Sequence, residues 1–256
     1  MQIESKFETC YYWETIGTYS GAYKANRRIK PQRFVIHSTG ASNPYLKRWV
    51  NDPEHAGENP NKNYFCGEND TQEVMPHAVF GLTSEEKYAI INILPYEYRC
   101  WGCGAGKLGS YNDSAIQIEI AEPYDLEDED YFNSAMVSVA EWCAKLCLLW
   151  NIPISEIYSH KEAAEKGYAS NHGDPEHWQK LHNYSMDDFR KEVERRIACE
   201  NYIGTDNAKV EVNLEGIDKK LYRVQVGAFS TEKAARDYKD SLNQKYGLDC
   251  FVVLPK

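Results

Sequence analysis

Three side chains that bind metal ions well come from three separate segments of the chain. His37 closes the apolar run Phe34-Val35-Ile36, His160 follows a second short apolar segment, and Asp174 lies fourteen residues further on. Two imidazoles and one carboxylate match the ligand set of a catalytic zinc site, in which a fourth position stays open for water. The spacing alone leaves a second interpretation open, because a histidine at a strand end is often held by a hydrogen bond and binds no metal.

The segments around these residues resemble the motifs of one enzyme family. In order and spacing they are similar to the zinc-dependent N-acetylmuramoyl-L-alanine amidases of the type-2 class, and the likeness extends over about residues 21 to 197. These enzymes share their fold with phage lysozyme-like amidases and peptidoglycan recognition proteins, and the pattern is most similar to endolysins and autolysins of Gram-positive type. Four segments carry the resemblance: Phe34–Gly40, Ser114–Glu119, Ser159–Glu162 and Ser170–Trp178.

The resemblance assigns a role to each matching position. It implies that His37, His160 and Asp174 bind Zn²⁺ and that Glu119 is the catalytic acid and base. Glu119 lies on the polar face of an alternating segment, which agrees with that role. His172 takes the position of the group that stabilises the oxyanion, where many relatives carry lysine.

The same resemblance implies a peptidoglycan hydrolase that lyses cell walls. Its substrate bond is the amide between N-acetylmuramic acid and L-alanine of the stem peptide, and zinc-activated water attacks it. Two alternatives remain: a non-catalytic peptidoglycan-binding receptor, and a zinc endopeptidase that cuts the stem peptide or cross-bridge. The complete set of His37, His160, Asp174 and Glu119 argues against a receptor, and only the products separate the two enzymes.

Several other residues have two interpretations each. His77, Trp101 and His177 are expected near the substrate, but each is also explained by packing. The pair Cys100 and Cys103 has the spacing of half a structural zinc site, yet the second pair that such a site needs is missing. Loop packing is the favoured interpretation of this pair, and a metal site or a disulfide bond is an alternative.

The hydrophobic pattern predicts the elements that position these residues. Ile116, Ile118 and Ile120 alternate with polar positions, as in a strand with two different faces. Apolar residues at steps of three and four from Phe132 to Trp150 predict one long helix, and a further helix begins at Ser185. Strands that alternate with helices predict an α/β fold, with a central mixed β-sheet flanked by helices and a small C-terminal βαβ unit.

The chain is expected to divide into an amidase domain (1–200), a linker (201–220) and a small βαβ module (221–256). Tyr222–Ser230 resembles the opening strand of the sporulation-related repeat, which binds peptidoglycan glycan strands. The usual module contains two βαβ halves and the chain carries one, so a homodimer that completes the module is one possibility.

Composition excludes several classes of partner. The 256 residues carry a net charge of −10, which argues against nucleic acid as a partner, since nucleic acid is bound through clustered cations. No apolar run approaches the ~20 residues of a membrane span, so no membrane insertion is expected. The start of the chain has no secretion-signal pattern. Synthesis in the cytoplasm, mostly free cysteines, and action on the wall after release are therefore expected.

Overall fold

The computed structural model describes residues 5–6, 10–65 and 73–203. The chain groups into two compact units, Met1–Cys199 and Glu200–Lys256, and the description below concerns the first unit. The expected linker, apart from its first three residues, and the whole expected C-terminal βαβ module lie outside the described residues.

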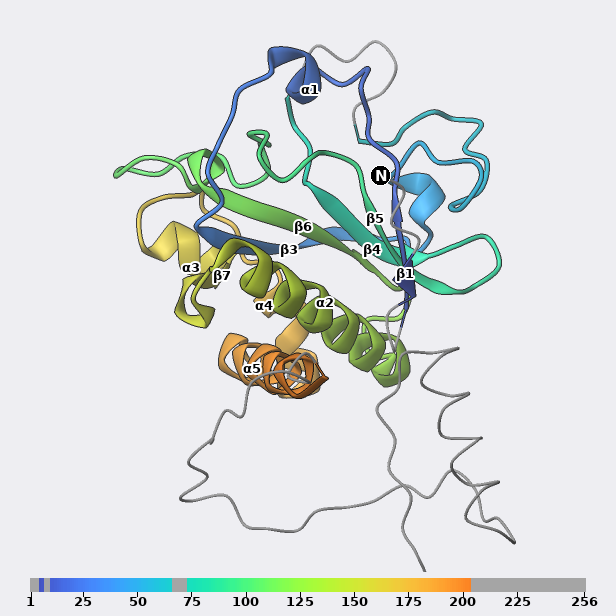
Figure 1. Ribbon diagram of the computed structural model, residues 1–256. Coiled ribbons are helices and arrows are strands. Elements are labelled where there is room, and N and C mark those ends of the chain that lie inside the picture. Colours follow the sequence, from blue (N-terminus) through green and yellow to red (C-terminus); the bar gives the residue numbers. More distant parts are fainter. Residues whose placement is uncertain (1–4, 7–9, 66–72, 204–256) are drawn as a thin grey trace, which may run out of the picture. The chain divides into compact units, whose positions relative to one another are not determined.

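A mixed seven-stranded sheet forms the centre of the first unit, as expected for the fold class (Figure 1). Its strand order is β1-β2-β5-β4-β6-β3-β7. Strands β1 and β2 are antiparallel, as are β4 and β5, whereas the other neighbouring pairs are parallel. The strands are β1 (Ser5–Lys6), β2 (Tyr11–Glu14), β3 (Arg33–Ser42), β4 (Ala78–Leu82), β5 (Tyr88–Asn92), β6 (Ala115–Glu122) and β7 (Ile157–Ser159).

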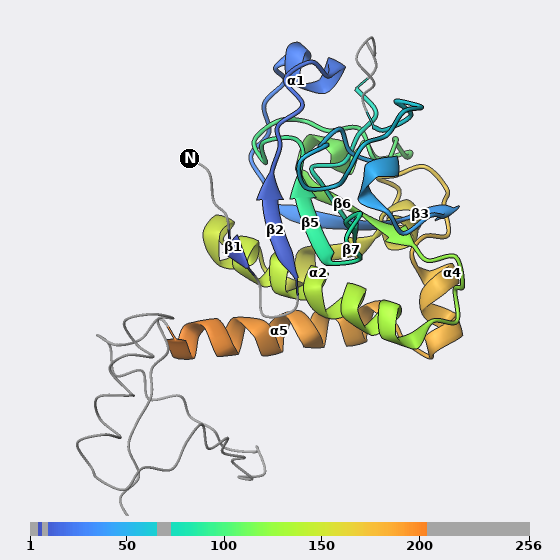
Figure 2. The ribbon, with the colours of Figure 1, turned by 90° about the vertical axis from the view of Figure 1, so that its right-hand side faces the viewer.

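The two faces of the sheet have different environments. Phe34 and Ile36 of β3 and the three isoleucines of β6 form the main core with helix α2 (Glu129–Trp150) and helix α5 (Met186–Ile203). Both helices lie on the same side of the sheet, whereas helix α1 (Gly21–Ala25) and the long loops lie on the other (Figures 1 and 2). The alternation expected for residues 114–121 is therefore confirmed, and it leaves the odd-numbered positions of β3 and β6 facing away from α2.

Both long helices begin close to where the sequence predicts and α2 ends there too, whereas α5 continues to Ile203, three residues into the expected linker. The Asp128 side chain caps α2 by accepting a hydrogen bond from the backbone N–H of Tyr131, and Asn151 ends the helix in a left-handed conformation. At the start of α5, Ser185 and Asp188 exchange side-chain to backbone hydrogen bonds in the reciprocal pattern of a capping box, which confirms the expected helix start at Ser185.

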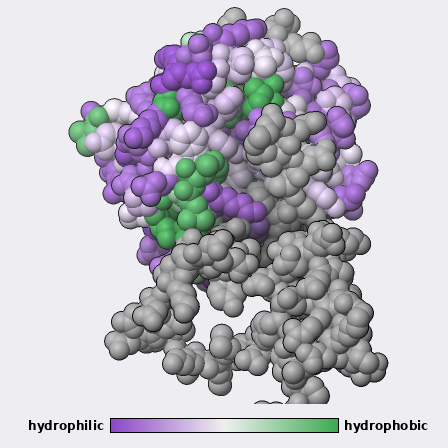
Figure 3. Space-filling model, in the orientation of Figure 1, coloured by the Kyte–Doolittle hydropathy of each residue, from purple (hydrophilic) through white to green (hydrophobic). Residues whose placement is uncertain are grey.

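Shorter elements complete the unit. Helix α3 (His160–Glu165) follows β7 directly, and helix α4 (Glu176–Gln179) lies in the segment before α5. Among the described residues no helix combines the length and apolar character needed to cross a bilayer. The face of the molecule in Figure 3 is mostly hydrophilic and carries only separated hydrophobic patches.

Candidate metal centre and active site

Strand register places the first two site residues side by side. In the parallel pair β3 and β6, His37 lies opposite Glu119, so both side chains leave the sheet on the same face. Strand β7 pairs its last residue, Ser159, with Ile36, and His160 follows at once as the first residue of α3. His37 lies within β3, which continues to Ser42, and not at the strand end that the sequence predicts. Strand β7 ends beside this part of β3, so His160 lies next to His37.

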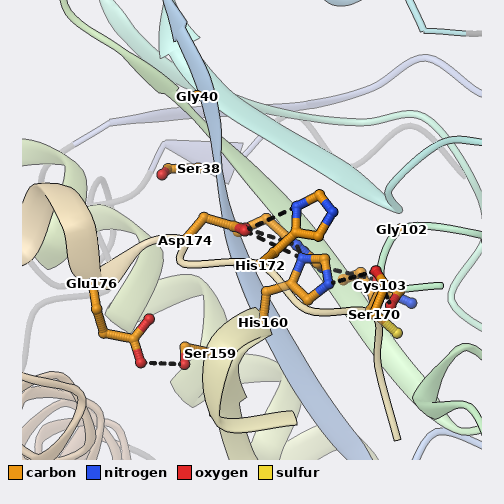
Figure 4. Close-up of polar contacts among 12 residues, drawn as sticks. Ser38, Gly40, Gly102, Cys103, Ser159, His160, Ser170, His172, Asp174 and Glu176 are labelled. Carbon is orange, nitrogen blue, oxygen red and sulfur yellow. Dashed lines mark hydrogen bonds and ion pairs between the residues drawn. The ribbon is translucent and has the colours of Figure 1, made fainter. Parts of the chain in front are cut away.

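His37, His160 and Asp174 converge on one point, as the sequence predicts. The two Nδ1 atoms lie 3.1 Å apart, and the Asp174 carboxylate oxygens lie 3.2 Å from that of His37 and 3.3 Å from that of His160 (Figure 4). Both imidazoles are almost completely buried, and Asp174 is 12% exposed. Within the part of the chain that the structure describes, this is the one group of histidine, cysteine and acidic residues with metal-site geometry.

The donor set fits a divalent cation. Each histidine uses its other nitrogen in a hydrogen bond, His37 Nε2 to Gln117 Oε1 at 2.9 Å and His160 Nε2 to Ser170 Oγ at 3.3 Å. Both Nδ1 atoms are thus free to face a metal, which is the usual arrangement of metal-binding histidines. Burial opposes ionisation of Asp174, but hydrogen bonds and the charges of both histidines hold its pKa far below the usual range.

Glu119 is the acidic residue next to this cluster. Its Oε2 atom is buried and has no hydrogen-bond partner among the described residues. Burial raises the pKa of Glu119 well above its ordinary value, and the nearby carboxylates of Asp174 and Glu122 raise it further. A raised pKa favours the protonated carboxyl that a general acid needs, and the ionised form of the same group can act as a general base.

Residues 27–177 match the family described as N-acetylmuramoyl-L-alanine amidase, which covers more than half of the chain. The chain belongs to this family. The bond that its members cleave joins N-acetylmuramic acid to L-alanine in peptidoglycan. A second match, to the SPOR domain, covers residues 218–254, which lie outside the described part of the chain. No curated protein matches the chain significantly.

Solved structures support the fold of the amidase. The Staphylococcus aureus hydrolase AmiA, solved in complex with its ligand, aligns at a TM-score of 0.55 with 20% identity, over 77% of this chain and 87% of that one. The PlyG catalytic domain aligns at a TM-score of 0.51 with 19% identity, over 73% and 94% of the two chains. The structure of PlyL aligns at 0.50 with 18% identity, over 73% and 97%. At these identities the likeness shows the fold alone.

In the amidase, His172 lies beside the His37, His160 and Asp174 cluster and is exposed to solvent. Its ring stacks on that of His160 with the ring centroids 4.4 Å apart, and its Nδ1 lies 3.7 Å from Asp174 Oδ1 (Figure 4). Its side chain is 58% exposed. A substrate can therefore reach His172 from solvent while it lies beside the cluster.

Of the three expected substrate contacts, two are accessible. Trp101 is 40% exposed and its ring lies under the Arg99 guanidinium. His177 is 41% exposed and pairs with the buried carboxylate of Glu122, with 2.9 Å between Nε2 and Oε1. Neither position is explained by core packing, so both stay predictions as substrate contacts.

His77 has the structural role that packing predicts. It has no exposed surface, its Nε2 donates to the Tyr98 carbonyl, and its Nδ1 accepts from the backbone N–H of Gln117. Burial lowers the pKa of His77 to about 4, so the ring stays neutral near pH 7. With both nitrogens occupied, His77 joins its segment to β6 and offers no group to a ligand.

Cys100 and Cys103 are buried free thiols, as are Cys143 and Cys147 on the buried face of α2. Burial raises the pKa of Cys103 to about 11, which disfavours the thiolate that a metal requires. Loop packing is therefore the interpretation that the structure favours for the first pair.

Three polar residues at this site were missed by sequence reasoning. Gln117 and Ser170 bind the outer nitrogens of the two histidines, and Glu122 accepts hydrogen bonds from Ser38 and the backbone N–H of Gly40. The alternation of β6 places Gln117 on the same face as Glu119, which was a usable signal. Its histidine partner is 80 residues away in the sequence, and no local pattern indicates that pairing.

Proposed function

We propose that the amidase binds one zinc ion through Nδ1 of His37, Nδ1 of His160 and the Asp174 carboxylate, with Glu119 as its acid and base. The observation that carries this proposal is the convergence of three donor groups beside Glu119 Oε2, a buried oxygen with no hydrogen-bond partner among the described residues. Zinc is preferred because an imidazole-rich set with one carboxylate and an open position is typical of catalytic zinc.

The chain's own residues then have defined tasks. When bound, zinc supplies a Lewis acid that polarises the scissile carbonyl and acidifies water. Glu119 accepts a proton from the attacking water and delivers it to the departing amine of L-alanine. His172, exposed beside the cluster, stabilises the negative charge that develops on the carbonyl oxygen. Trp101 and His177 contact the glycan or the stem peptide.

The test is product analysis on purified cell walls, with and without a chelator. The proposed reaction releases new L-alanine amino termini, leaves the glycan chains intact and stops when the metal is removed. An endopeptidase releases other amino termini, and a receptor releases none. Elemental analysis of the same preparation measures whether one zinc ion is bound per chain.

We also propose that the enzyme lyses walls and is held on them by its C-terminal module. The SPOR match supports this proposal, because tethering to an insoluble substrate raises the local concentration of the catalytic unit. Two copies pairing their half-modules would complete one repeat. Sedimentation at micromolar concentration tests this, since a monomer that still binds walls contradicts the dimer.

The site of action is part of the same proposal. We infer that the enzyme acts on the wall after release from the cytoplasm. Its lytic activity on cells should then depend on membrane permeabilisation, measured as the fall in turbidity with and without a pore-forming agent.

A further inference from the structure

The position of one proton on His37 decides whether it can bind a metal. A neutral imidazole carries its proton on one nitrogen, and the other nitrogen keeps the lone pair that a metal needs. His37 presents Nδ1 to the cluster. To bind a metal through Nδ1, it must carry its proton on Nε2. Gln117 Oε1 lies 2.9 Å from Nε2 and can accept that proton in a hydrogen bond.

The orientation of the Gln117 amide is itself determined by a chain of hydrogen bonds. Gln117 Nε2 donates to Asn112 Oδ1 at 2.8 Å, and Asn112 Nδ2 donates to the Gly104 carbonyl at 2.8 Å. Asn112 Oδ1 also accepts from the backbone N–H groups of Gly102 and Cys103 at 3.2 and 3.1 Å. A backbone carbonyl can only accept and a backbone N–H can only donate. These three backbone groups therefore fix both amides, and the fixed amides fix the proton of His37.

Burial makes the flipped orientation of either amide energetically unfavourable. Asn112 and Gln117 have no exposed surface, so a flipped amide would leave buried donors facing donors and acceptors facing acceptors. The backbone at Gly102 packs closely against the hydrogen bond between Gln117 Oε1 and His37 Nε2. A Cβ atom added to Gly102 would lie 2.3 Å from Gln117 Oε1 and 3.5 Å from His37 Nε2.

The same loop orients the second histidine by a similar contact. Ser170 Oγ donates to the Cys103 carbonyl at 3.2 Å, so its oxygen lone pairs face His160 Nε2 at 3.3 Å (Figure 4). The hydroxyl proton is thus already used, and the contact with His160 requires an Nε2–H group. Backbone groups of residues 102–104 therefore orient both the Asn112 and Gln117 amides next to His37 and the Ser170 hydroxyl next to His160.

We propose that Asn112 and Gln117 are positioning residues that lock His37 in its Nε2–H form and so prepare Nδ1 for the metal. The effect on metal binding rests on the proposed zinc site. The fixed tautomer itself is a property of the metal-free protein. Gln117 and Asn112 are buried and are not among the three converging donors, so their effect is transmitted through the proton on His37.

Two variants break the lock in different ways. Gln117→Leu removes the acceptor at similar volume, whereas Gly102→Ala keeps every polar group and displaces Gln117 Oε1 by steric contact. Gly17→Ala is the matched control, because its added methyl group meets nothing closer than 3.6 Å. Zinc affinity, measured by competition with a chromophoric chelator, should fall about 10- to 100-fold in the first two variants and stay unchanged in the control.

The decisive readout is nitrogen-15 NMR of the imidazoles in metal-free protein at pH 8. Wild type and Gly17→Ala should show the His37 proton on Nε2, and Gln117→Leu should show it on Nδ1 or exchanging between both nitrogens. Gln117→Glu supplies a rescue, because a carboxylate accepts from Nε2 but cannot donate to Asn112. It should restore the tautomer and the zinc affinity while lowering the unfolding temperature.

Three results would overturn the inference. They are a wild-type His37 protonated on Nδ1 alone, a Gln117→Leu protein with unchanged tautomer and zinc affinity, and a Gln117→Glu protein that binds zinc as weakly as Gln117→Leu. If Gln117→Leu does not fold, Gly102→Ala and Gln117→Glu still separate the outcomes. Failure of wild type to bind zinc would contradict the proposed function instead, while the NMR result on the metal-free protein would still decide the lock.

Discussion

Replacement of Glu119 by glutamine tests the proposed acid and base with the smallest change of shape. The amide keeps the volume of the side chain but can no longer accept or deliver a proton at neutral pH. General acid and base catalysis contributes about 10²- to 10⁴-fold, which corresponds to about 3 to 5 kcal/mol of transition-state stabilisation. We therefore expect kcat to fall by that factor and zinc binding to be retained, because Glu119 is not one of the three converging donors.

The same substitution has a predicted effect on stability in the metal-free protein. The pKa of Glu119 is raised in the folded state by burial and then by Asp174 and Glu122, whereas in the unfolded state it is ordinary. Above about pH 4.5 the folded state therefore holds a proton that the unfolded state has lost, so stability decreases as pH rises towards the folded pKa. The slope is at most about 1.4 kcal/mol per pH unit. Glu119→Gln should remove this slope.

Two measurements check the prediction. Release of L-alanine amino termini from purified walls gives the rate, and elemental analysis gives the zinc content of the same sample. Urea unfolding of metal-free wild type and variant at several pH values between 4.5 and 8 gives the stability difference, which should increase with pH in favour of the variant. An active Glu119→Gln enzyme with bound zinc would refute the catalytic role, and a pH-independent difference would refute the electrostatic reasoning.

Three further predictions follow from other parts of the chain. His160→Ala should abolish zinc binding and activity, measured by elemental analysis, because it leaves a His37 and Asp174 pair without the third donor. The folded pKa of His77 is about 4, below the ordinary 6.5, so its neutral ring contributes fully to the free energy of unfolding above about pH 6.5. That contribution is lost as pH falls towards 4, and His77→Gln should remove this acid sensitivity. Between pH 6.5 and 5, thermal unfolding of metal-free wild type should show about 2 kcal/mol more loss than the variant. Deletion of residues 218–254 should leave the cleavage of soluble muropeptides unchanged and reduce wall binding in a co-sedimentation assay.

Much of the scaffold is predictable because its signals are local. The alternation of Ile116, Ile118 and Ile120 describes the two faces of β6 correctly, and the apolar stripe that begins at Phe132 describes α2. Caps such as Asp128 are equally local, since they involve groups three residues apart. Each of these signals depends on residues that are only two to four positions apart in the sequence.

Other elements depend on partners that are distant in the sequence. Strand β2 was not predicted, and it lies in the sheet because it pairs with β5 in parallel, nearly eighty residues later. The ambiguity of His77 has the same origin. Only the positions of the Tyr98 carbonyl and the Gln117 N–H show that both of its nitrogens are occupied.

For the active site, the sequence alone determined which chemical groups are present and that Glu119 lies on the polar face of its strand, but it placed His37 at a strand end, whereas β3 continues to Ser42. The tertiary structure decided the rest. It brings His37 within 3.1 Å of His160 across 123 residues and excludes solvent from Glu119 Oε2. It also fixes the proton of His37 through buried amides. Ligand geometry, desolvation and tautomer are set by distance and surroundings in space, which residue types and spacing do not specify.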